Sequence, residues 1–289
     1  MQLPSDNRFI TTRKRFHEVL DEEYGPDEVN AFLAVLCHTY LQWNRADMVL
    51  HANRPLSESE LLKFHFALKE LRSGKPLQYI LGESPFLGLS FLVNEHVLIP
   101  RPETEELVMH IHQALKARDN ARILDVGTGS GCIPIALKHL NPMLEVEALD
   151  VSEKALAVAR ENAGRNGAAV VFHQSDILKD EHPAWTNTWT CIVSNPPYIL
   201  EKEKEQMKRN VLNFEPHLAL FVHDDDPILF YRVIARKAMK WLTAAGSLWF
   251  EINPVYAKAI EAMLRDNGFT HVEHLTDLQG KSRMVKALR

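Results

Sequence analysis

At residues 190–198 the chain reads Thr190-Cys191-Ile192-Val193-Ser194-Asn195-Pro196-Pro197-Tyr198. The first part is a short apolar run with β-branched residues, which predicts a buried strand. Proline has no N–H to give to a sheet and keeps the residue before it extended, so the strand must end at Asn195. In an open α/β sheet, ligands bind at the carboxyl ends of the strands. This stretch therefore predicts a ligand site directly after the strand.

The Asn-Pro-Pro-Tyr segment carries groups that suit a planar amino group. Asn195 has a side-chain oxygen that accepts and an amide that donates. The carbonyl of Pro196 has a fixed direction because the ring of Pro197 restricts the backbone. Tyr198 adds a flat apolar face with a polar tip. Two acceptors and a stacking face fit an amide or a base amine, although the same four residues are also compatible with a structural Pro-Pro turn.

On both sides of this stretch, predicted strands alternate with predicted helices from residue 121 onward. Such alternation indicates an α/β fold with a doubly wound, mostly parallel, Rossmann-like sheet. Seven strands are expected, at residues 122–126, 146–150, 170–172, 191–193, 247–252, 272–275 and 283–288. Helices are expected between them, at residues 133–140, 153–166, 227–241 and 255–267, and a charged helix or loop at residues 201–208.

The segments before the sheet have a different character. Residues 1–75 show helical spacing of apolar residues and a nearly neutral charge, which predicts a small helical bundle. Residues 76–100 contain short apolar runs at 78–81, 91–93 and 97–99, which predict strands of a β-hairpin linker. The sheet domain is then expected to occupy residues 101–289.

A glycine-rich loop follows the first strand of the sheet. Its three glycines alternate with other residues, which allows a tight turn and close approach of a ligand to the backbone. A dinucleotide fingerprint needs G-x-G-x-x-G, and here the third glycine comes one residue early, which weakens that reading. The spacing instead resembles the loop of S-adenosylmethionine-dependent methyltransferases. The candidate cofactor residues of this loop are Gly127, Thr128, Gly129, Ser130 and Gly131.

Two acidic residues follow the next two strands. Asp150 ends the second strand, where its carboxylate can accept hydrogen bonds from ribose hydroxyls. Asp176 follows the third strand, where it can accept from an adenine amine while Ile177 covers the ring. Either acid alone is better explained as a solvated strand end. Their placement after successive strands, with Asn195 after the fourth, indicates one shared nucleoside site.

Composition limits the possible functions. The hydrophobic content of 46% and the charged content of 25% are those of an ordinary soluble protein. The net charge of −5 gives no general electrostatic reason to bind nucleic acid. The three cysteines lack metal or disulfide spacing, and none of the 14 histidines lies in the glycine loop or at Asn195–Tyr198. With no signal peptide and no apolar run near the ~20 residues of a membrane span, we expect a cytoplasmic protein without a metal or a membrane partner.

Taken together, these motifs resemble the release factor glutamine methyltransferases, the PrmC/HemK family. The resemblance covers residues 76–289, and the Pro-Arg-Pro-Glu-Thr-Glu sequence within it is the most diagnostic piece. One departure is the segment 251–254, which reads Glu-Ile-Asn-Pro where the family usually has a glycine after the glutamate. The matching segments are Pro76–Gly82, Val97–Glu105, Asp125–Gly131, Asn195–Tyr198, Phe214–Pro216 with Ala219–Leu220, and Asp277–Arg283.

The resemblance implies an enzyme that uses S-adenosylmethionine. Its substrate would be the glutamine of the Gly-Gly-Gln motif of peptide chain release factors, methylated on the side-chain amide nitrogen. Asn195 and Pro196 would then accept the two amide N–H bonds, Tyr198 would stack on the amide plane, and Pro197 would belong to the same substrate site. Residues 1–75 would hold the protein substrate, and the enzyme is expected to act as a monomer.

Several other functions stay open at this point. The nearest are methylation of a glutamine in a ribosomal protein and methylation of an adenine amine in nucleic acid. Adenine methylation needs a basic groove, which the acidic balance disfavours. A non-catalytic binding protein is disfavoured by the intact Asn195–Tyr198 segment, and a dinucleotide oxidoreductase is disfavoured by the glycine spacing.

Overall fold

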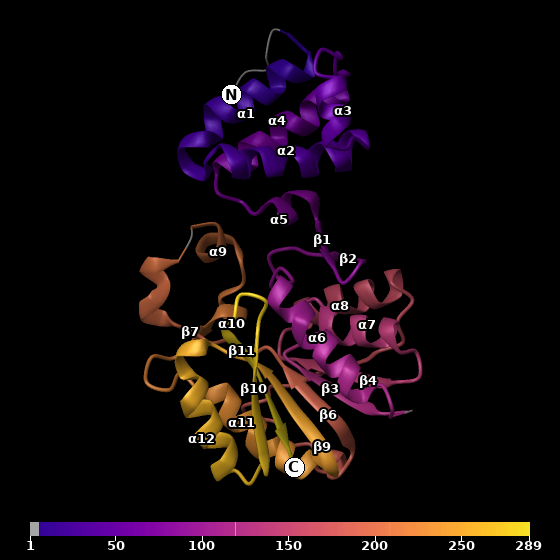
Figure 1. The fold of residues 1–289 in the computed structure, drawn as a ribbon, viewed down its shortest axis with the longest axis vertical. Coiled ribbons are helices and arrows are strands. Elements are labelled where there is room, and N and C mark those ends of the chain that lie inside the picture. The colour runs from indigo at the N-terminus through magenta and orange to yellow at the C-terminus, as the bar shows by residue number, and fades with distance from the viewer. Residues whose placement is uncertain (1–5, 119, 208) are drawn as a thin grey trace. The chain divides into compact units, whose positions relative to one another are not determined.

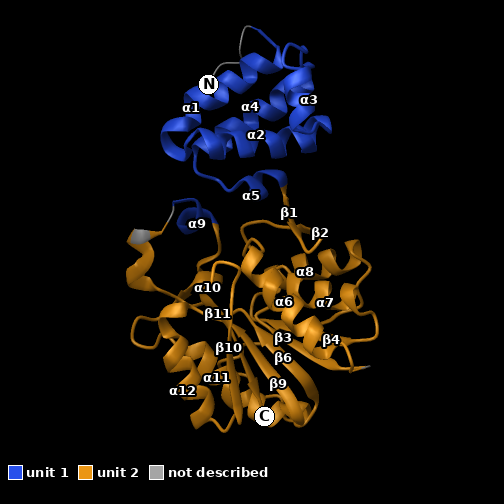
Figure 2. Cartoon of the chain, viewed as in Figure 1, with its two compact units in different colours: residues 1–81, 209–214 blue, residues 82–208, 215–289 orange. Residues whose placement is uncertain are grey.

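A computed structural model describes residues 6–118, 120–207 and 209–289 (Figure 1). The chain forms two compact units, coloured separately in Figure 2. Unit 1 consists of residues 1–81 together with 209–214, and unit 2 of residues 82–208 together with 215–289. The short second segment of unit 1 is separated from the first by more than a hundred residues of sequence, and no local pattern predicted that it belongs there.

Unit 1 is helical. Its helices are α1 Phe9–Tyr24, α2 Pro26–Leu41, α3 Arg45–Leu50, α4 Glu58–Arg72, α5 Leu77–Leu81 and α9 Arg209–Phe214. The start of α4 is a capping box, in which Ser57 N–H donates to Glu60 Oε2 (2.7 Å) and Glu60 N–H donates to Ser57 Oγ (3.3 Å). The strand predicted at residues 78–81 was wrong. This run lies in α5, where the Pro76 carbonyl accepts from the following turn, so its backbone groups are satisfied locally.

A β-hairpin opens unit 2. Its strands β1 (Glu83–Phe86) and β2 (Leu89–Leu92) pair antiparallel, which confirms the hairpin. Gly88 in its turn has a φ of 78°, a conformation that favours glycine. The predicted strand at residues 97–99 was wrong. The Ile99 N–H donates to Glu215 Oε2 (3.3 Å) rather than to a neighbouring strand.

The predicted seven-stranded, mostly parallel sheet is confirmed. Its strand order is β10-β11-β9-β6-β3-β4-β5, and only the β10–β11 and β11–β9 pairs are antiparallel. The chain therefore runs outward from β3 in both directions, which places the carboxyl ends of β3, β4 and β6 at one edge. The strands are β3 Arg122–Val126, β4 Glu145–Asp150, β5 Val171–Gln174, β6 Trp189–Ser194, β9 Leu242–Glu251, β10 His271–Thr276 and β11 Ser282–Leu288.

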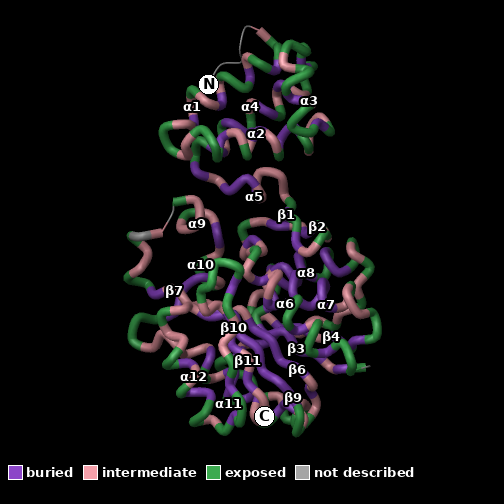
Figure 3. Tube along the Cα trace, viewed as in Figure 1, coloured by how far each residue is buried: buried purple, intermediate pink, exposed green. Residues whose placement is uncertain are grey.

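Helices cover both faces of the sheet. Alternate strand residues belong to different cores: Ile123 packs with α6 and α7, and Leu124 packs with α11 and α12. Figure 3 shows the buried residues concentrated along the central strands. This burial on both faces is why the strands are apolar throughout rather than alternating. The covering helices are α6 Pro102–Leu115, α7 Cys132–Leu140, α8 Glu153–Arg165, α11 Leu229–Trp241 and α12 Ala257–Asp266.

The remaining elements are short. They are η1 Pro183–Trp185, β7 Ile199–Leu200, η2 Glu201–Gln206, α10 His217–Leu220, β8 Phe221–Val222 and η3 Pro254–Tyr256. The η2 helix occupies most of the charged segment expected to be a helix or loop, and residue 208 lies outside the described residues. Among the helices that the structure describes, none is both long and apolar enough to cross a membrane.

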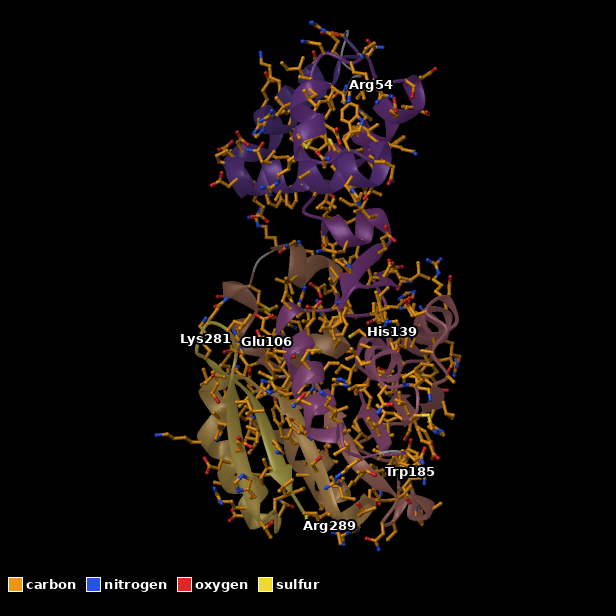
Figure 4. All side chains as sticks on the ribbon, turned by 45° about the vertical axis from the view of Figure 1, so that its right-hand side comes forward. Arg54, Glu106, His139, Trp185, Lys281 and Arg289 are labelled. Carbon is orange, nitrogen blue, oxygen red and sulfur yellow. The ribbon has the colours of Figure 1, made fainter. Side chains whose placement is uncertain are left out.

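The closing loop between β10 and β11 is held by one carboxylate. Asp277 Oδ1 accepts from the N–H groups of Gln279 and Lys281 (both 2.9 Å), and its other oxygen pairs with Arg283 Nε (3.3 Å). The Leu278 N–H donates to Glu106 Oε1 of α6 (3.4 Å), and Figure 4 labels Glu106 and Lys281 on the two elements. The motif at residues 277–283 thus anchors a hairpin end against α6.

Candidate active site

The carboxyl ends of β3, β4, β5 and β6 border a cavity of about 340 Å³ in unit 2. It contains most of the residues that the sequence predicted for cofactor and substrate. Those that line it are Gly127, Thr128, Gly129, Ser130, Asp150, Asp176, Ile177, Asn195, Pro196 and Pro197. Gly131 and Tyr198 do not line it.

The three positions of the loop require glycine for different structural reasons. All have positive φ: 78° at Gly127, 54° at Gly129 and 79° at Gly131. A Cβ on either of the first two would meet no protein atom within 4 Å, so their bare backbone faces open space. A Cβ on Gly131 would lie 3.0 Å from Ile135 Cδ1 and 3.2 Å from Ala159 Cβ. Gly131 therefore serves the packing of the loop on α7 and α8.

Two glycine substitutions are expected to separate these roles. Gly131→Ala should destabilise the fold by roughly 2–4 kcal/mol, because it combines a left-handed backbone with overpacking. Gly129→Ala should cost about 1–2 kcal/mol of stability, because only the backbone strain applies. Its main effect should be weaker cofactor binding. Urea unfolding and calorimetric titration with S-adenosylmethionine measure the two quantities, and equal stability losses in both variants would contradict the assignment.

Asp150 holds the glycine loop at the end of β4. Its Oδ2 accepts from the Gly129 N–H (2.9 Å), and its Oδ1 accepts from the Ser152 N–H (2.9 Å). Burial raises the pKa of this carboxyl, while the backbone donors oppose the shift. Each oxygen keeps a further lone pair that can receive a hydroxyl donor from the cavity.

Asp176 and Ile177 lie at the end of the cavity that follows β5. Asp176 Oδ1 accepts from the Leu178 N–H (3.0 Å), and its Oδ2 pairs with Lys179 Nζ (3.0 Å). The Ile177 side chain is buried and contributes to the core next to α11 and α12. The arrangement offers a carboxylate and an apolar wall to a flat ring with an amino group.

Asp125 is a further buried acid that the sequence did not assign. It is fully buried at the end of β3, and within the described residues neither carboxylate oxygen has a hydrogen-bond partner. The Thr128 hydroxyl in the loop above is also unpartnered there. Burial raises the pKa of Asp125 to about 7. Thr128 lines the cavity, whereas Asp125 does not. The only sequence signal for Asp125 was its position two residues before the first glycine.

A buried polar chain stands behind Asn195. The Asn195 Nδ2 donates to Thr104 Oγ1 (3.3 Å), and Thr104 Oγ1 donates to Glu251 Oε2 (2.6 Å). Glu251 is 2% exposed, and burial raises its pKa to about 7. The Tyr198 hydroxyl donates to Glu251 Oε1 (3.5 Å), so its tip is directed at this acid. Stacking of Tyr198 on a substrate amide stays a prediction.

An ion pair braces another part of the cavity wall. Arg101 Nη2 lies 2.6 Å from Glu215 Oε1, and the Glu215 side chain is almost completely buried. Arg101 and the neighbour of Glu215, Pro216, both line the cavity. His96 lines it as well, although no local pattern in the sequence singled it out. Arg101 and Glu215 are 114 positions apart, so no local sequence pattern could predict that they pair.

Comparison with known proteins places this geometry in a family. The profile of the Methyltransferase small domain matches residues 104–214, and that of the PrmC N-terminal domain matches residues 13–82. The release factor glutamine methyltransferase of Flavobacterium psychrophilum is 42% identical over 95% of this chain and 96% of its own length. The chain belongs to the release factor glutamine methyltransferase family. The family predicted from the sequence is thereby confirmed.

Two further comparisons concern the family and the fold. The release factor glutamine methyltransferase of Bacteroides thetaiotaomicron is 40% identical over 93% of this chain and 96% of its own. A methyltransferase structure from Pyrococcus furiosus has a TM-score of 0.50 at 18% identity, and covers 70% of this chain and 89% of that one. The similarity to the Pyrococcus furiosus structure concerns the fold alone. Like its relatives, this release factor glutamine methyltransferase family member is an S-adenosylmethionine-dependent enzyme.

Proposed function

We propose that this protein transfers a methyl group from S-adenosylmethionine to the side-chain amide nitrogen of the glutamine in the Gly-Gly-Gln motif of peptide chain release factors. Membership of the family, whose members at 42% and 40% identity are release factor glutamine methyltransferases, supports this substrate. The observation that carries the proposal is the orientation of Asn195. Its Nδ2 is engaged by Thr104 on the protein side, and Asn195 itself lines the cavity.

The chemical task is to make an amide nitrogen react. Its lone pair is delocalised into the carbonyl, so it is a weak nucleophile. An acceptor at each N–H would raise its electron density and hold it in one direction, and the Asn195 oxygen and the Pro196 carbonyl are the two acceptors proposed. Preorganised dipoles of this kind each supply several kcal/mol in catalysis.

The remaining residues bind and orient. When bound, S-adenosylmethionine supplies an electrophilic methyl group on a sulfonium. Gly127–Ser130, Asp150, Asp176 and Ile177 would hold it. Transfer forms a nitrogen–carbon bond and breaks the sulfur–methyl bond. One amide proton leaves for solvent, and the products are a methylated glutamine and S-adenosylhomocysteine.

The protein substrate is expected to be a release factor rather than nucleic acid. The net charge of −5 gives no electrostatic attraction to phosphate chains, and unit 1 is nearly neutral. We propose that the helices of unit 1 recognise the factor and that the enzyme works as a monomer. Because release factors act at ribosomes, the cytoplasm is the expected compartment.

The test is transfer of labelled methyl from S-adenosylmethionine to a purified release factor. Label should appear on the factor and vanish when the Gly-Gly-Gln glutamine is changed to Ala. Labelling that survives this change would move the modified site elsewhere. A factor that stays unlabelled, with the cofactor still bound by calorimetry, would refute the proposed substrate. A ribosomal protein fraction and an adenine-containing oligonucleotide, assayed in parallel, test the two alternatives.

A further inference from the structure

The side chain of Asn195 is one end of a chain of three hydrogen-bonded polar side chains. Asn195 follows β6, Thr104 lies in the first turn of α6, and Glu251 ends β9. Thr104 is 3% exposed and Glu251 is 2% exposed, so the link between them is shielded from water. The distances are 3.3 Å from Asn195 Nδ2 to Thr104 Oγ1 and 2.6 Å from Thr104 Oγ1 to Glu251 Oε2.

The hydrogen bonds of this chain have a defined direction when Glu251 is ionised. An ionised carboxylate only accepts, so the Thr104 hydroxyl then donates its single proton to Glu251. The Thr104 oxygen is then left as an acceptor, and the group of Asn195 that faces it must be the amide nitrogen. The Asn195 oxygen consequently turns the other way. Among the described residues no donor is directed at that oxygen, and both Asn195 and Thr104 line the cavity.

The position of Glu251 is itself fixed. Its backbone carbonyl accepts from the Tyr231 hydroxyl (3.2 Å), and its backbone is paired in register with Met284 of β11. The Tyr198 hydroxyl donates to its second carboxylate oxygen (3.5 Å). Burying a carboxylate costs free energy that hydrogen bonds only partly restore, and an apolar residue would fill the space more cheaply. This chain of three side chains is therefore better explained by the orientation that it gives to Asn195 than by a contribution to stability.

We propose that Thr104, held by Glu251, is a positioning residue that keeps the side-chain oxygen of Asn195 pointed at the substrate amide. This inference rests on the proposed function, because it concerns which atom of Asn195 meets the glutamine N–H. Without the hydroxyl, Asn195 can adopt either amide orientation. In the reversed one it presents a donor to a donor, which blocks the reactive alignment.

The first test compares Thr104→Val, which keeps the shape and removes the hydroxyl, with Thr104→Ser, which restores the hydroxyl. Thr104→Val should lower kcat for release factor methylation roughly tenfold to a hundredfold, since a misaligned catalytic group has effects of that order. KM for the factor and Kd for S-adenosylmethionine should stay close to wild type, whereas Tm should fall because buried Glu251 loses its closest donor. Thr104→Ser should restore most of the kcat. A Thr104→Val enzyme with wild-type kcat, or a serine variant as slow as the valine variant, would overturn the inference.

A second measurement does not depend on the substrate. In isotope-labelled protein, the side-chain NH2 signals of Asn195 should exchange slowly with solvent in wild type and in Thr104→Ser, and rapidly in Thr104→Val. Equal exchange in all three proteins would overturn the inference. If wild type shows the protected signals but methylates no release factor, the proposed substrate fails while the orientation of Asn195 stands.

Discussion

Asn195→Ala is expected to lower kcat for methyl transfer to a release factor by about a hundredfold to a thousandfold, the usual effect of removing one preorganised hydrogen-bond group from a reacting centre. The variant loses the oxygen that would accept from the glutamine N–H. It leaves Gly129, Asp150 and Asp176 in place, so Kd for S-adenosylmethionine should change little. Initial rates at saturating cofactor, with a parallel calorimetric titration, measure both effects.

Asn195→Asp sharpens this result. It keeps the size and the acceptor of Asn195 but loses the Nδ2 donor to Thr104, and it adds a negative charge close to buried Glu251. Its kcat should lie between those of wild type and Asn195→Ala. An alanine variant that keeps more than a tenth of the wild-type kcat would show that the acceptor on Asn195 does not carry the reaction.

The second large effect is expected at Asp150. Asp150→Ala should raise Kd for S-adenosylmethionine roughly tenfold to a hundredfold, because hydrogen bonds to a charged group each contribute about 1.5–3 kcal/mol. The variant removes the acceptor that holds the Gly129 N–H at 2.9 Å and the carboxylate that would receive the ribose hydroxyls. At saturating cofactor, kcat should recover to near the wild-type value.

Two control variants accompany the Asp150 measurement. Asp150→Asn retains one oxygen acceptor and should weaken binding less than the alanine variant. Asp266→Ala changes an exposed acid at the end of α12, away from the cavity lining, and should leave Kd unchanged. A fall in kcat at saturating cofactor without a change in Kd would contradict a cofactor-binding role for Asp150.

Local patterns predicted most of the sheet. The strand ending at Asn195 was evident because prolines cannot continue a sheet, and the glycine loop was evident because its spacing permits a tight turn after β3. The same reasoning was wrong at residues 78–81 and 97–99. Short apolar runs look alike in strands and helices, and only the available hydrogen-bond partners decide between them. At 97–99 the partner is the side chain of Glu215, which no local pattern reveals.

The candidate site divides in a similar way. Residues that follow successive strands, such as Asp150 and Asp176, were predictable because parallel strands bring their carboxyl ends to one edge. Asp125 was missed because its complete burial depends on how distant segments pack around β3. The direction of the Tyr198 hydroxyl toward Glu251 was also beyond the sequence, since it depends on where β9 ends relative to β6.

The strands and helices of the main sheet, the cofactor loop and the Asn-Pro-Pro-Tyr segment could be predicted from the sequence, because each depends on residues close together in the chain. Only the tertiary structure decided how Asn195 is oriented. The Thr104–Glu251 hydrogen bond joins residues 147 positions apart, and the Arg101–Glu215 pair joins residues 114 apart. Burial and the direction of hydrogen bonds arise when distant segments pack together, so they cannot be predicted from local periodicity.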